Sequence, residues 1–343
     1  MNRIFAVTTR GLEKVSANEL SRLPGVTIEQ IAYRRVFASC EGSFSSLLSL
    51  RTVDDVFLHV ATWQGIDRAR QALSTLREAS ARMNLGTALA LCQQIRKIPN
   101  PPAFSVTANF VGKRNYNTDE IKLACASGIV EGQGWLYKEN DAAADLNLRI
   151  FIEGDSAVVG VRIATQSLSK RPYKQGHVPG SLKPAVAAAL LQLANVTSDM
   201  QVLDPCCGAG TILIEAASKG ITAYGGDITQ EAVTTARFNV TKANVDIDIQ
   251  RWDARALPIS NKSVNCVISN LPWGRAVSTD GSLDILYQEI SEEIERVLAP
   301  GGKTVLLTNL PDSIQFRRLK CDQQFEISLF GQRPTITVWS DQS

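Results

Sequence analysis

The chain has 343 residues, of which 44% are apolar and 20% are charged. At about 150 residues per domain, this length predicts about two domains, each with enough chain to bury its own core. The composition disfavours a largely disordered chain, a collagen-like repeat and a small disulfide scaffold.

The distribution of apolar residues along the chain argues against a membrane-spanning or secreted protein. No apolar run approaches the ~20 residues that a membrane span needs, and the apolar start gives way to Thr8 and Thr9 too early for a signal peptide. We therefore expect a cytoplasmic protein with no membrane partner.

The charge differs between the two halves of the chain. Residues 1–180 carry 22 Lys and Arg against 16 Asp and Glu, whereas residues 181–343 carry 14 against 18. The basic front half is compatible with a polyanionic partner, although an ordinary solvated surface has the same charge.

Cysteine and histidine usage argues against a metal site. The seven cysteines form no C-x-x-C pair, and the only histidines, His59 and His177, do not stand at metal-binding spacing. We therefore expect no metal ion.

The first half of the chain predicts small α+β layers. Its first part alternates short apolar runs with one helical pattern, as strands over 4–7, 27–31 and 35–39 and a helix over 12–23. A second unit begins near Arg51, with a strand over 56–60, helices within 67–96, a strand over 104–110, a helix over 121–131 and a hairpin of 146–152 with 157–163. Asn117 and Glu120 have the spacing of a capping box that opens the helix over 121–131.

The apolar pattern lapses between Ala164 and Gly180, where the segment Ser169–Gly176 is polar and basic. Beyond it, strands and helices alternate strictly. Strands are predicted over 201–204, 222–227, 247–252, 264–270, 304–309, 325–330 and 335–339, and helices over 182–193, 211–219, 230–243, 283–298 and 311–319. Alternating βα units with nearly all-apolar strands predict an α/β domain with a mostly parallel sheet, closed by an antiparallel hairpin.

A glycine-rich turn follows the first strand of this domain and opens a helix. The run Asp204-Pro-Cys206-Cys207-Gly208-Ala-Gly210-Thr211 lets a ligand approach backbone N–H groups directly. It has neither the G-x-G-x-x-G spacing of dinucleotide-binding folds nor the Gly-Lys-Ser/Thr of a P-loop, which argues against NAD and against ATP hydrolysis.

Acidic residues end three successive strands. Asp204 would suit a ligand that carries an ammonium group, Asp227 could accept hydrogen bonds from ribose hydroxyls, and Asp253 could accept from the exocyclic amine of adenine. Each acid alone is more often a solvated or capping carboxylate, but three in this order favour S-adenosylmethionine as the cofactor. The predicted cofactor site also includes Ile228 and Ala254, which follow two of the acids.

The fourth strand ends in Asn270-Leu271-Pro272-Trp273-Gly274, at the sheet edge where open α/β folds bind their ligands. An amine that attacks a methyl group needs two acceptors for its hydrogens, which the Asn270 side-chain oxygen and the Leu271 carbonyl could supply. Pro272 holds Leu271 extended, and Trp273 could stack on a flat base. Asn270 would also border the cofactor. In isolation the same motif could be a turn with an aromatic plug.

Together, Asp204–Thr211 and Asn270–Gly274 resemble the class I (Rossmann-like) methyltransferase motifs of the amino-methylating group. The wider pattern is similar to the THUMP-domain RNA methyltransferases, of the tRNA (guanine-N2)-methyltransferase type. The residues that carry this likeness are Arg51–Asp55, Phe104–Gly134, the 146–163 hairpin, Lys170–Tyr173 and Gly180–Pro184.

The resemblance implies a ferredoxin-like part over 1–50, a THUMP RNA-binding domain over 51–165, a linker over 166–180 and a methyltransferase domain with a seven-stranded sheet over 181–343. It implies methylation of a guanosine N2 amine in tRNA, with the 3′ CCA end and the acceptor stem as the regions bound. Position 6 of the acceptor stem is favoured and position 10 is second. Two departures from the family pattern are Cys206, where Phe is common, and Leu271, where Pro is common.

Basic residues are the expected RNA contacts, because neutralising the backbone supplies much of RNA affinity. The candidates are Lys113, Arg114, Arg171 and Lys174, each of which could equally be part of an ordinary wet surface. A catalytic cysteine is disfavoured, since Cys206 lies in the cofactor turn and Cys266 lies inside a buried strand. The alternatives left open are the same chemistry on ribosomal RNA, methylation of an adenine or glutamine amine, and an RNA-binding protein with a degenerate catalytic domain.

Overall fold

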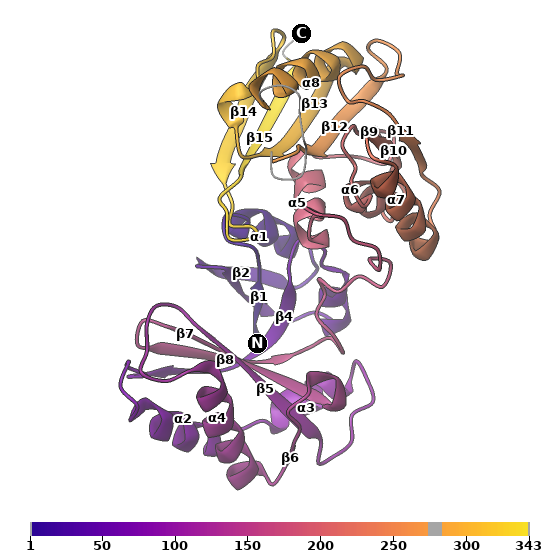
Figure 1. The fold of residues 1–343 in the computed structure, drawn as a ribbon. Coiled ribbons are helices and arrows are strands. Elements are labelled where there is room, and N and C mark those ends of the chain that lie inside the picture. Colours follow the sequence, from indigo (N-terminus) through magenta and orange to yellow (C-terminus); the bar gives the residue numbers. More distant parts are fainter. Residues whose placement is uncertain (1, 274–282, 342–343) are drawn as a thin grey trace. The chain divides into compact units, whose positions relative to one another are not determined.

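The computed structural model describes residues 2–273 and 283–341, which divide into two compact units (Figure 1). The first unit combines Met1–Val7 with Ala17–Leu168, and the second combines Thr8–Ser16 with Ser169–Ser343. Helix α1 (Glu13–Ser21) contributes residues to both units. Within the described ranges, no helix is both long enough and apolar enough to cross a bilayer.

An eight-stranded sheet with the order β2-β3-β1-β4-β8-β7-β5-β6 organises the first unit. Its strands are β1 (Asn2–Val7), β2 (Val26–Ala32), β3 (Arg35–Cys40), β4 (Asp55–Gln64), β5 (Ala103–Phe110), β6 (Leu136–Tyr137), β7 (Leu146–Glu153) and β8 (Ser156–Arg162). Its further helices are α2 (Ala72–Ala81), α3 (Gly86–Gln93) and α4 (Thr118–Gln133), with 3-10 turns η1 (Phe44–Ser49) and η2 (Asp141–Ala143). The predicted capping box of Asn117 and Glu120 is confirmed at the start of α4.

Side chains alternate across this sheet, as the period of two requires. Ile4 and Ala6 of β1 belong to the large core that includes helix residues, whereas Phe5 and Val7 belong to a smaller cluster on strands β1, β4 and β8. Strand β4 pairs with both β1 and β8, so the sheet is continuous through the predicted boundary at residue 50. The division into a ferredoxin-like part and a THUMP domain stays a prediction.

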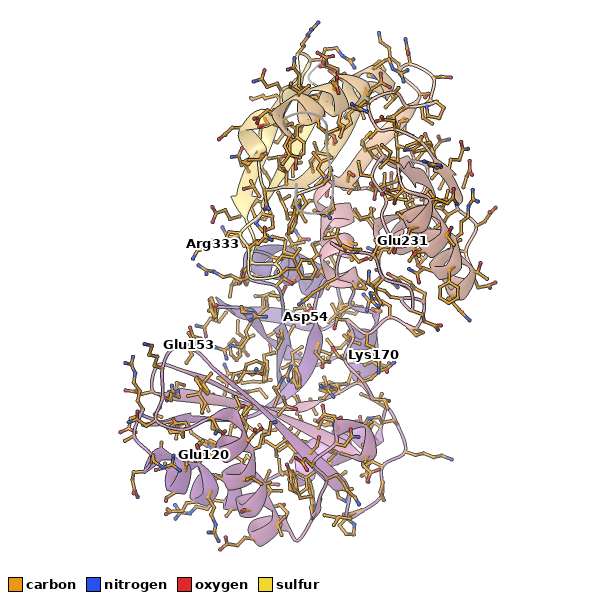
Figure 2. The ribbon with its side chains drawn as sticks, in the orientation of Figure 1. Asp54, Glu120, Glu153, Lys170, Glu231 and Arg333 are labelled. Carbon is orange, nitrogen blue, oxygen red and sulfur yellow. The ribbon has the colours of Figure 1, made fainter. Side chains whose placement is uncertain are left out.

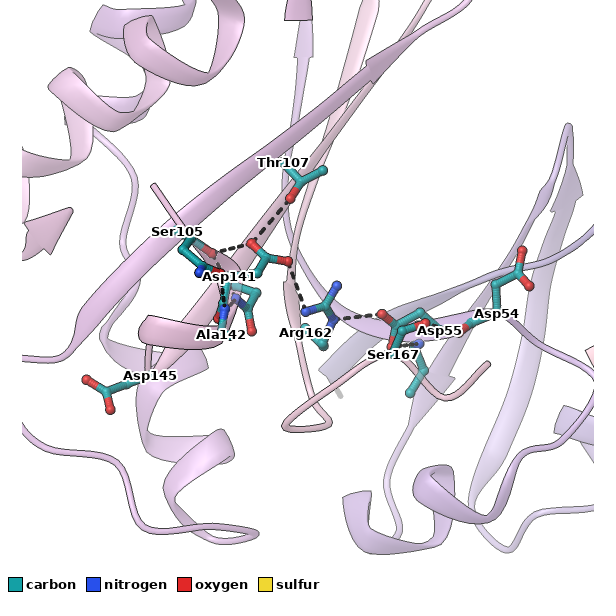
Figure 3. A network of polar contacts seen from close by, with 12 residues as sticks. Asp54, Asp55, Ser105, Thr107, Asp141, Ala142, Asp145, Arg162 and Ser167 are labelled. Carbon is teal, nitrogen blue, oxygen red and sulfur yellow. Dashed lines mark hydrogen bonds and ion pairs between the residues drawn. The ribbon is translucent and has the colours of Figure 1, made fainter. Parts of the chain in front are cut away.

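A charge network with a buried centre, Arg162 and Asp55, lies in the first unit (Figure 3). The Arg162 Nε atom lies 2.7 Å from Asp55 Oδ2, and Arg162 Nη1 lies 3.3 Å from Asp141 Oδ2. Asp141 Oδ1 accepts a hydrogen bond of 2.6 Å from Ser105 Oγ. Burial raises the pKa of Asp55, an effect that the Arg162 guanidinium opposes. The network therefore joins η2 and β5 to the paired strands β4 and β8 through partners that lie within the unit.

The second unit contains a seven-stranded sheet with the order β11-β10-β9-β12-β13-β15-β14. Its strands are β9 (Gln201–Asp204), β10 (Thr222–Asp227), β11 (Asp248–Arg251), β12 (Val264–Asn270), β13 (Leu298–Thr308), β14 (Leu319–Glu326) and β15 (Thr335–Asp341). Its helices are α5 (Pro184–Leu193), α6 (Thr211–Ala217), α7 (Gln230–Ala243) and α8 (Leu283–Val297). Strands β9 to β13 pair in parallel, and β15 pairs antiparallel with both β13 and β14. The predicted α/β fold with a mostly parallel sheet is confirmed.

Helices cover both faces of this sheet. On β9, Val202 packs in a core that includes residues of α5, α6 and α7, while its neighbour Leu203 packs in a core that includes Ile290 and Ile294 of α8. Strands buried on both faces read as continuous apolar runs, which explains why their sequences do not alternate.

The predicted boundaries of the helix and strand near the carboxyl terminus are wrong. The predicted helix over 311–319 is only a 3-10 turn, η3 (Pro311–Ser313), and the predicted strand over 325–330 lies earlier, at Leu319–Glu326. Strand β14 is polar and mostly exposed because it lies at the edge of the sheet, so its sequence lacks the apolar run of a central strand. The predicted antiparallel pairing of the last two strands is confirmed.

Candidate active site

The glycine turn between β9 and α6 has the conformation that its sequence requires. Gly208 has φ +51° and Gly210 has φ +76°, in the left-handed region that favours glycine. The Cys207 N–H group donates to the Gly226 carbonyl at 2.8 Å. The turn is therefore held against the end of β10, next to the carboxyl edge of the sheet.

Asp204 ends β9 and is 1% exposed. Its Oδ1 atom accepts hydrogen bonds from Ser269 Oγ at 2.7 Å and from the Cys206 N–H at 3.1 Å. Burial raises the pKa of Asp204 to about 7, although these two donors favour its charged form. A ligand cation at this position would recover the electrostatic energy that burial removes.

Asp227 ends β10 and contacts the glycine turn directly. Its Oδ2 atom accepts from the Gly208 N–H at 3.0 Å, and its Oδ1 atom accepts from the Thr229 N–H at 3.1 Å. The carboxylate thus lies beside the turn, as a ribose-binding acid would. The neighbouring Ile228 side chain is 49% exposed.

Asp253 follows β11 and already has a cationic partner. Its two oxygens accept from Arg255, with Nη2 to Oδ2 at 2.7 Å and Nε to Oδ1 at 3.0 Å. The hydrogen bonds from Arg255 lower the pKa of Asp253. An adenine amine would therefore share this carboxylate with Arg255. The predicted neighbour Ala254 is buried and packs with the α8 core.

Asn270 ends β12, at the same edge of the sheet as the acids. Its Nδ2 group donates to the Gly180 carbonyl at 3.4 Å, whereas its Oδ1 atom is buried and has no hydrogen-bond partner among the described residues. A buried acceptor without a partner costs about 1–3 kcal/mol, so a ligand donor at this atom would be stabilising. The orientation of the amide leaves its oxygen for that donor.

The rest of the motif is held from two sides. The Leu271 N–H donates to the Leu307 carbonyl at 3.0 Å, and the Pro272 carbonyl accepts from Tyr287 Oη at 2.7 Å. The Trp273 ring lies 6.3 Å from that of Phe330, and its Nε1 atom is buried without a partner in the described part of the chain. Gly274, the last residue of the motif, lies outside the described residues.

Burial raises the pKa of both Cys206 and Cys207, and the nearby carboxylates raise it further. Both thiols are therefore protonated at neutral pH. This environment opposes formation of a thiolate nucleophile, in agreement with a reaction that needs no covalent intermediate.

Three of the four predicted RNA contacts donate hydrogen bonds to acceptors within the protein. Arg171 Nε donates to Glu215 Oε1 at 3.1 Å, and Lys174 Nζ donates to Thr211 Oγ1 at 2.6 Å. Burial lowers the pKa of Lys174 to about 8. Arg114 Nη1 donates to the carbonyls of Ile66 and Asp67 at 2.9 and 2.8 Å. These cations stabilise local structure.

Two lysines that are sequence neighbours of Arg114 and Arg171 are exposed to solvent. Lys113, the fourth predicted contact, is exposed, and so is Lys170 at the start of the basic segment (Figure 2). These two side chains are available for an external phosphate.

Several residues that position the site were missed by the sequence analysis. Ser269 holds Asp204, Tyr287 holds the Pro272 carbonyl, and Asn239 of α7 donates to the carbonyls of Gly176 and Ala209, both at 3.0 Å. Asn239 thereby ties the basic segment to the glycine turn. A lone hydroxyl in the apolar run before Asn270 was a usable signal for Ser269, whereas Tyr287 and Asn239 lie in ordinary amphipathic helices.

The residues present fit S-adenosylmethionine. The glycine turn offers close backbone approach, the ends of β9 and β10 offer carboxylates, and Asn270 Oδ1 is an acceptor without a partner in the described chain. These acceptor oxygens, together with the N–H groups of the turn, match a nucleoside with a cationic amino-acid part.

Comparison with known proteins shows which family the chain resembles. Residues 171–328 match the family model described as an RMKL-like methyltransferase domain. The chain is 31% identical over 312 residues to the tRNA (guanine(6)-N2)-methyltransferase of Thermus thermophilus, which covers 89% of each chain. A shorter match of 36% identity covers 38% of this chain and 40% of the tRNA (guanine(10)-N2)-dimethyltransferase of Methanothermobacter thermautotrophicus.

A solved structure extends the likeness to the whole fold. The crystal structure of TrmN from Thermus thermophilus superimposes with a TM-score of 0.78 at 25% identity, covering 99% of this chain and 100% of that one. The predicted class I methyltransferase fold is thus confirmed. On the match of 31% identity over 89% of both chains, the chain belongs to the tRNA guanine-N2-methyltransferase family.

Proposed function

We propose that the protein methylates the exocyclic N2 amine of a guanosine in tRNA, with S-adenosylmethionine as the methyl donor. Family membership supports the reaction class. The observation that carries the assignment of the catalytic residue is the buried Asn270 Oδ1 atom, which has no partner among the described residues. An amine hydrogen would satisfy it.

The reaction needs orientation of the amine more than activation of a nucleophile. The cofactor, when bound, supplies an activated methyl group on its sulfonium. Asn270 Oδ1 and the Leu271 carbonyl would each accept one amine hydrogen and so direct the nitrogen lone pair at that methyl group. Trp273 would stack on the guanine, which must leave its helix to reach this edge of the sheet.

The cofactor would lie along the ends of the first three strands. Asp204 would bind its ammonium group, Asp227 its ribose hydroxyls, and Asp253 the adenine amine together with Arg255. The N–H groups near Gly208 and Gly210 would approach the amino-acid part. Asp227 has further acceptor capacity beside its hydrogen bond of 3.0 Å from the Gly208 N–H, so it could bind ribose hydroxyls without losing that contact.

Position 6 of the acceptor stem is the preferred target, because the relative that matches over 89% of both chains is named for that position. The 3′ CCA end is the expected anchor for the first unit. Lys113 and Lys170 are proposed as phosphate contacts on account of their exposure. Position 10 is the second candidate, supported by the shorter match to the dimethyltransferase.

A methyl-transfer assay on unmodified transcripts tests the proposal. We expect transfer from radiolabelled S-adenosylmethionine to tRNA but not to ribosomal RNA, with N2-methylguanosine as the product after nucleoside digestion. Replacement of G6 by A in the tRNA should abolish transfer, whereas replacement of G10 should not. Transfer to neither RNA would contradict the proposed function, and loss of transfer only with the G10 variant would move the target to position 10.

A further inference from the structure

Among the residues that the structure describes, hydrogen bonds hold the Asp204 carboxylate through only one of its oxygens. Both of its hydrogen bonds, from Ser269 Oγ at 2.7 Å and from the Cys206 N–H at 3.1 Å, reach Oδ1. Neither reaches Oδ2, and no ion pair to Asp204 occurs in the described ranges of the chain. One oxygen is thus fixed by the protein, and the other is left for a partner.

The hydroxyl that fixes Asp204 comes from the strand that carries the catalytic motif. Strand β12 lies beside β9, with Val267 opposite Leu203, so Ser269 lies near the end of β9. Ser269 is fully buried, and it immediately precedes Asn270. Because successive side chains of a strand point to opposite faces, Ser269 and Asn270 are directed to different sides of β12.

We infer that Ser269 is a positioning residue for cofactor binding, which holds Asp204 through Oδ1 so that Oδ2 receives the ammonium group of S-adenosylmethionine. The inference rests on the proposed role of Asp204 and adds the residue that orients it. Ser269 touches no substrate itself. A charge-assisted hydrogen bond from an ammonium group depends on the direction of the carboxylate, so losing the serine hydroxyl weakens the ammonium contact.

The groups around Asp204 determine how strongly the Ser269 hydroxyl affects the charge state of this carboxyl group. The titratable groups that face it are Asp227 from β10 and the thiols of Cys206 and Cys207 from the turn. None of these supplies a positive charge. Burial raises the pKa of Asp204 to about 7. Among the effects that lower this pKa, the hydrogen bond from Ser269 is the largest. Removing the hydroxyl therefore raises the pH at which Asp204 becomes charged.

Calorimetry with two ligands tests the inference without any RNA. S-adenosylhomocysteine carries the ammonium group, whereas 5′-methylthioadenosine has the same adenosine thioether without the amino-acid part. We expect Ser269→Ala to weaken S-adenosylhomocysteine binding about tenfold and to leave 5′-methylthioadenosine binding unchanged. The pH midpoint for S-adenosylhomocysteine binding should also move upward from its value near the Asp204 pKa of about 7.

Two further variants complete the experiment. Ser269→Cys keeps the size with a weaker donor and should give an intermediate loss, which also serves if the alanine variant does not fold. Thr304→Val removes another buried hydroxyl of the same sheet, which donates to the Val267 carbonyl at 2.9 Å, and should leave both ligands unaffected.

Unchanged S-adenosylhomocysteine affinity in Ser269→Ala, or equal losses for both ligands, would overturn the inference. Because neither ligand binds through RNA, a failure of the tRNA assay would contradict the proposed function and leave this result intact.

Discussion

The two units contain polar networks of opposite character. In the first unit, Arg162 lies between Asp55 and Asp141, and Asp141 also accepts from Ser105. In the second unit, and within the described residues, Asp204 accepts hydrogen bonds through one oxygen only and Asn270 Oδ1 has no partner. The first network holds strands of the fold together, whereas we propose that the oxygens at the strand ends of the second unit bind a ligand.

The largest effect on catalysis is expected from a substitution of Asn270, whose Oδ1 atom has no partner among the described residues. Asn270→Ala removes the acceptor that we propose orients the amine, so kcat for methyl transfer should fall by about 10²- to 10³-fold. Affinity for S-adenosylhomocysteine, measured by calorimetry, should stay at its wild-type value. Normal transfer by this variant would remove Asn270 from the mechanism.

Breaking the satisfied network should cost stability and not catalysis. Asp55→Ala leaves the Arg162 guanidinium, with only 9% of its side chain exposed, without its nearer carboxylate. Strands β4 and β8 should lose about 3 kcal/mol of protection, measured by native-state hydrogen exchange. Glu78→Ala, which breaks the exposed pair with Arg82, is the matched control and should change protection by less than about 0.5 kcal/mol. Equal small effects of the two substitutions would contradict a structural role for the buried network.

Asp227 should contribute to cofactor affinity. Asp227→Ala removes the proposed ribose acceptor, and S-adenosylhomocysteine should bind about 10- to 100-fold more weakly by calorimetry. Glu231→Ala, on the exposed first turn of α7 (Figure 2), should leave the affinity unchanged. A ribose site elsewhere would be indicated if both variants bound alike.

Lys174 provides a smaller, pH-dependent test of the structural cations. Its pKa is about 8 in the folded protein, against 10.5 for an ordinary lysine, because burial disfavours the charged form. Between these values the unfolded chain binds more protons than the folded one, so stability should rise with pH in this window. Lys174→Met should lack this rise when free energies of unfolding are measured from neutral pH to pH 10.5. An equal pH dependence in the variant would contradict the lowered pKa of Lys174.

The sequence predicted those parts of the structure that depend on local chemistry. The capping box at Asn117, the glycine turn and the acids at strand ends all follow from residue types at fixed spacing. The boundaries near the C-terminus did not follow, because the polar edge strand Leu319–Glu326 lacks an apolar signal.

Tertiary partners were beyond the reach of the sequence. Arg171 and Lys174 read as a basic surface, and only the fold brings Glu215 and Thr211 against them. The same holds for Tyr287, whose contact with the Pro272 carbonyl joins residues 15 positions apart. Residue type and spacing thus predicted the polar groups at the strand ends better than the groups that hold them.

A crystal structure with S-adenosylhomocysteine bound tests the central claim most directly. The account predicts the ligand ammonium at Asp204 Oδ2, the ribose hydroxyls at Asp227, and Asn270 Oδ1 directed at the space beside the sulfur atom. A ligand bound away from these carboxylates, or an Asn270 oxygen bonded by the protein's own donors, would contradict it.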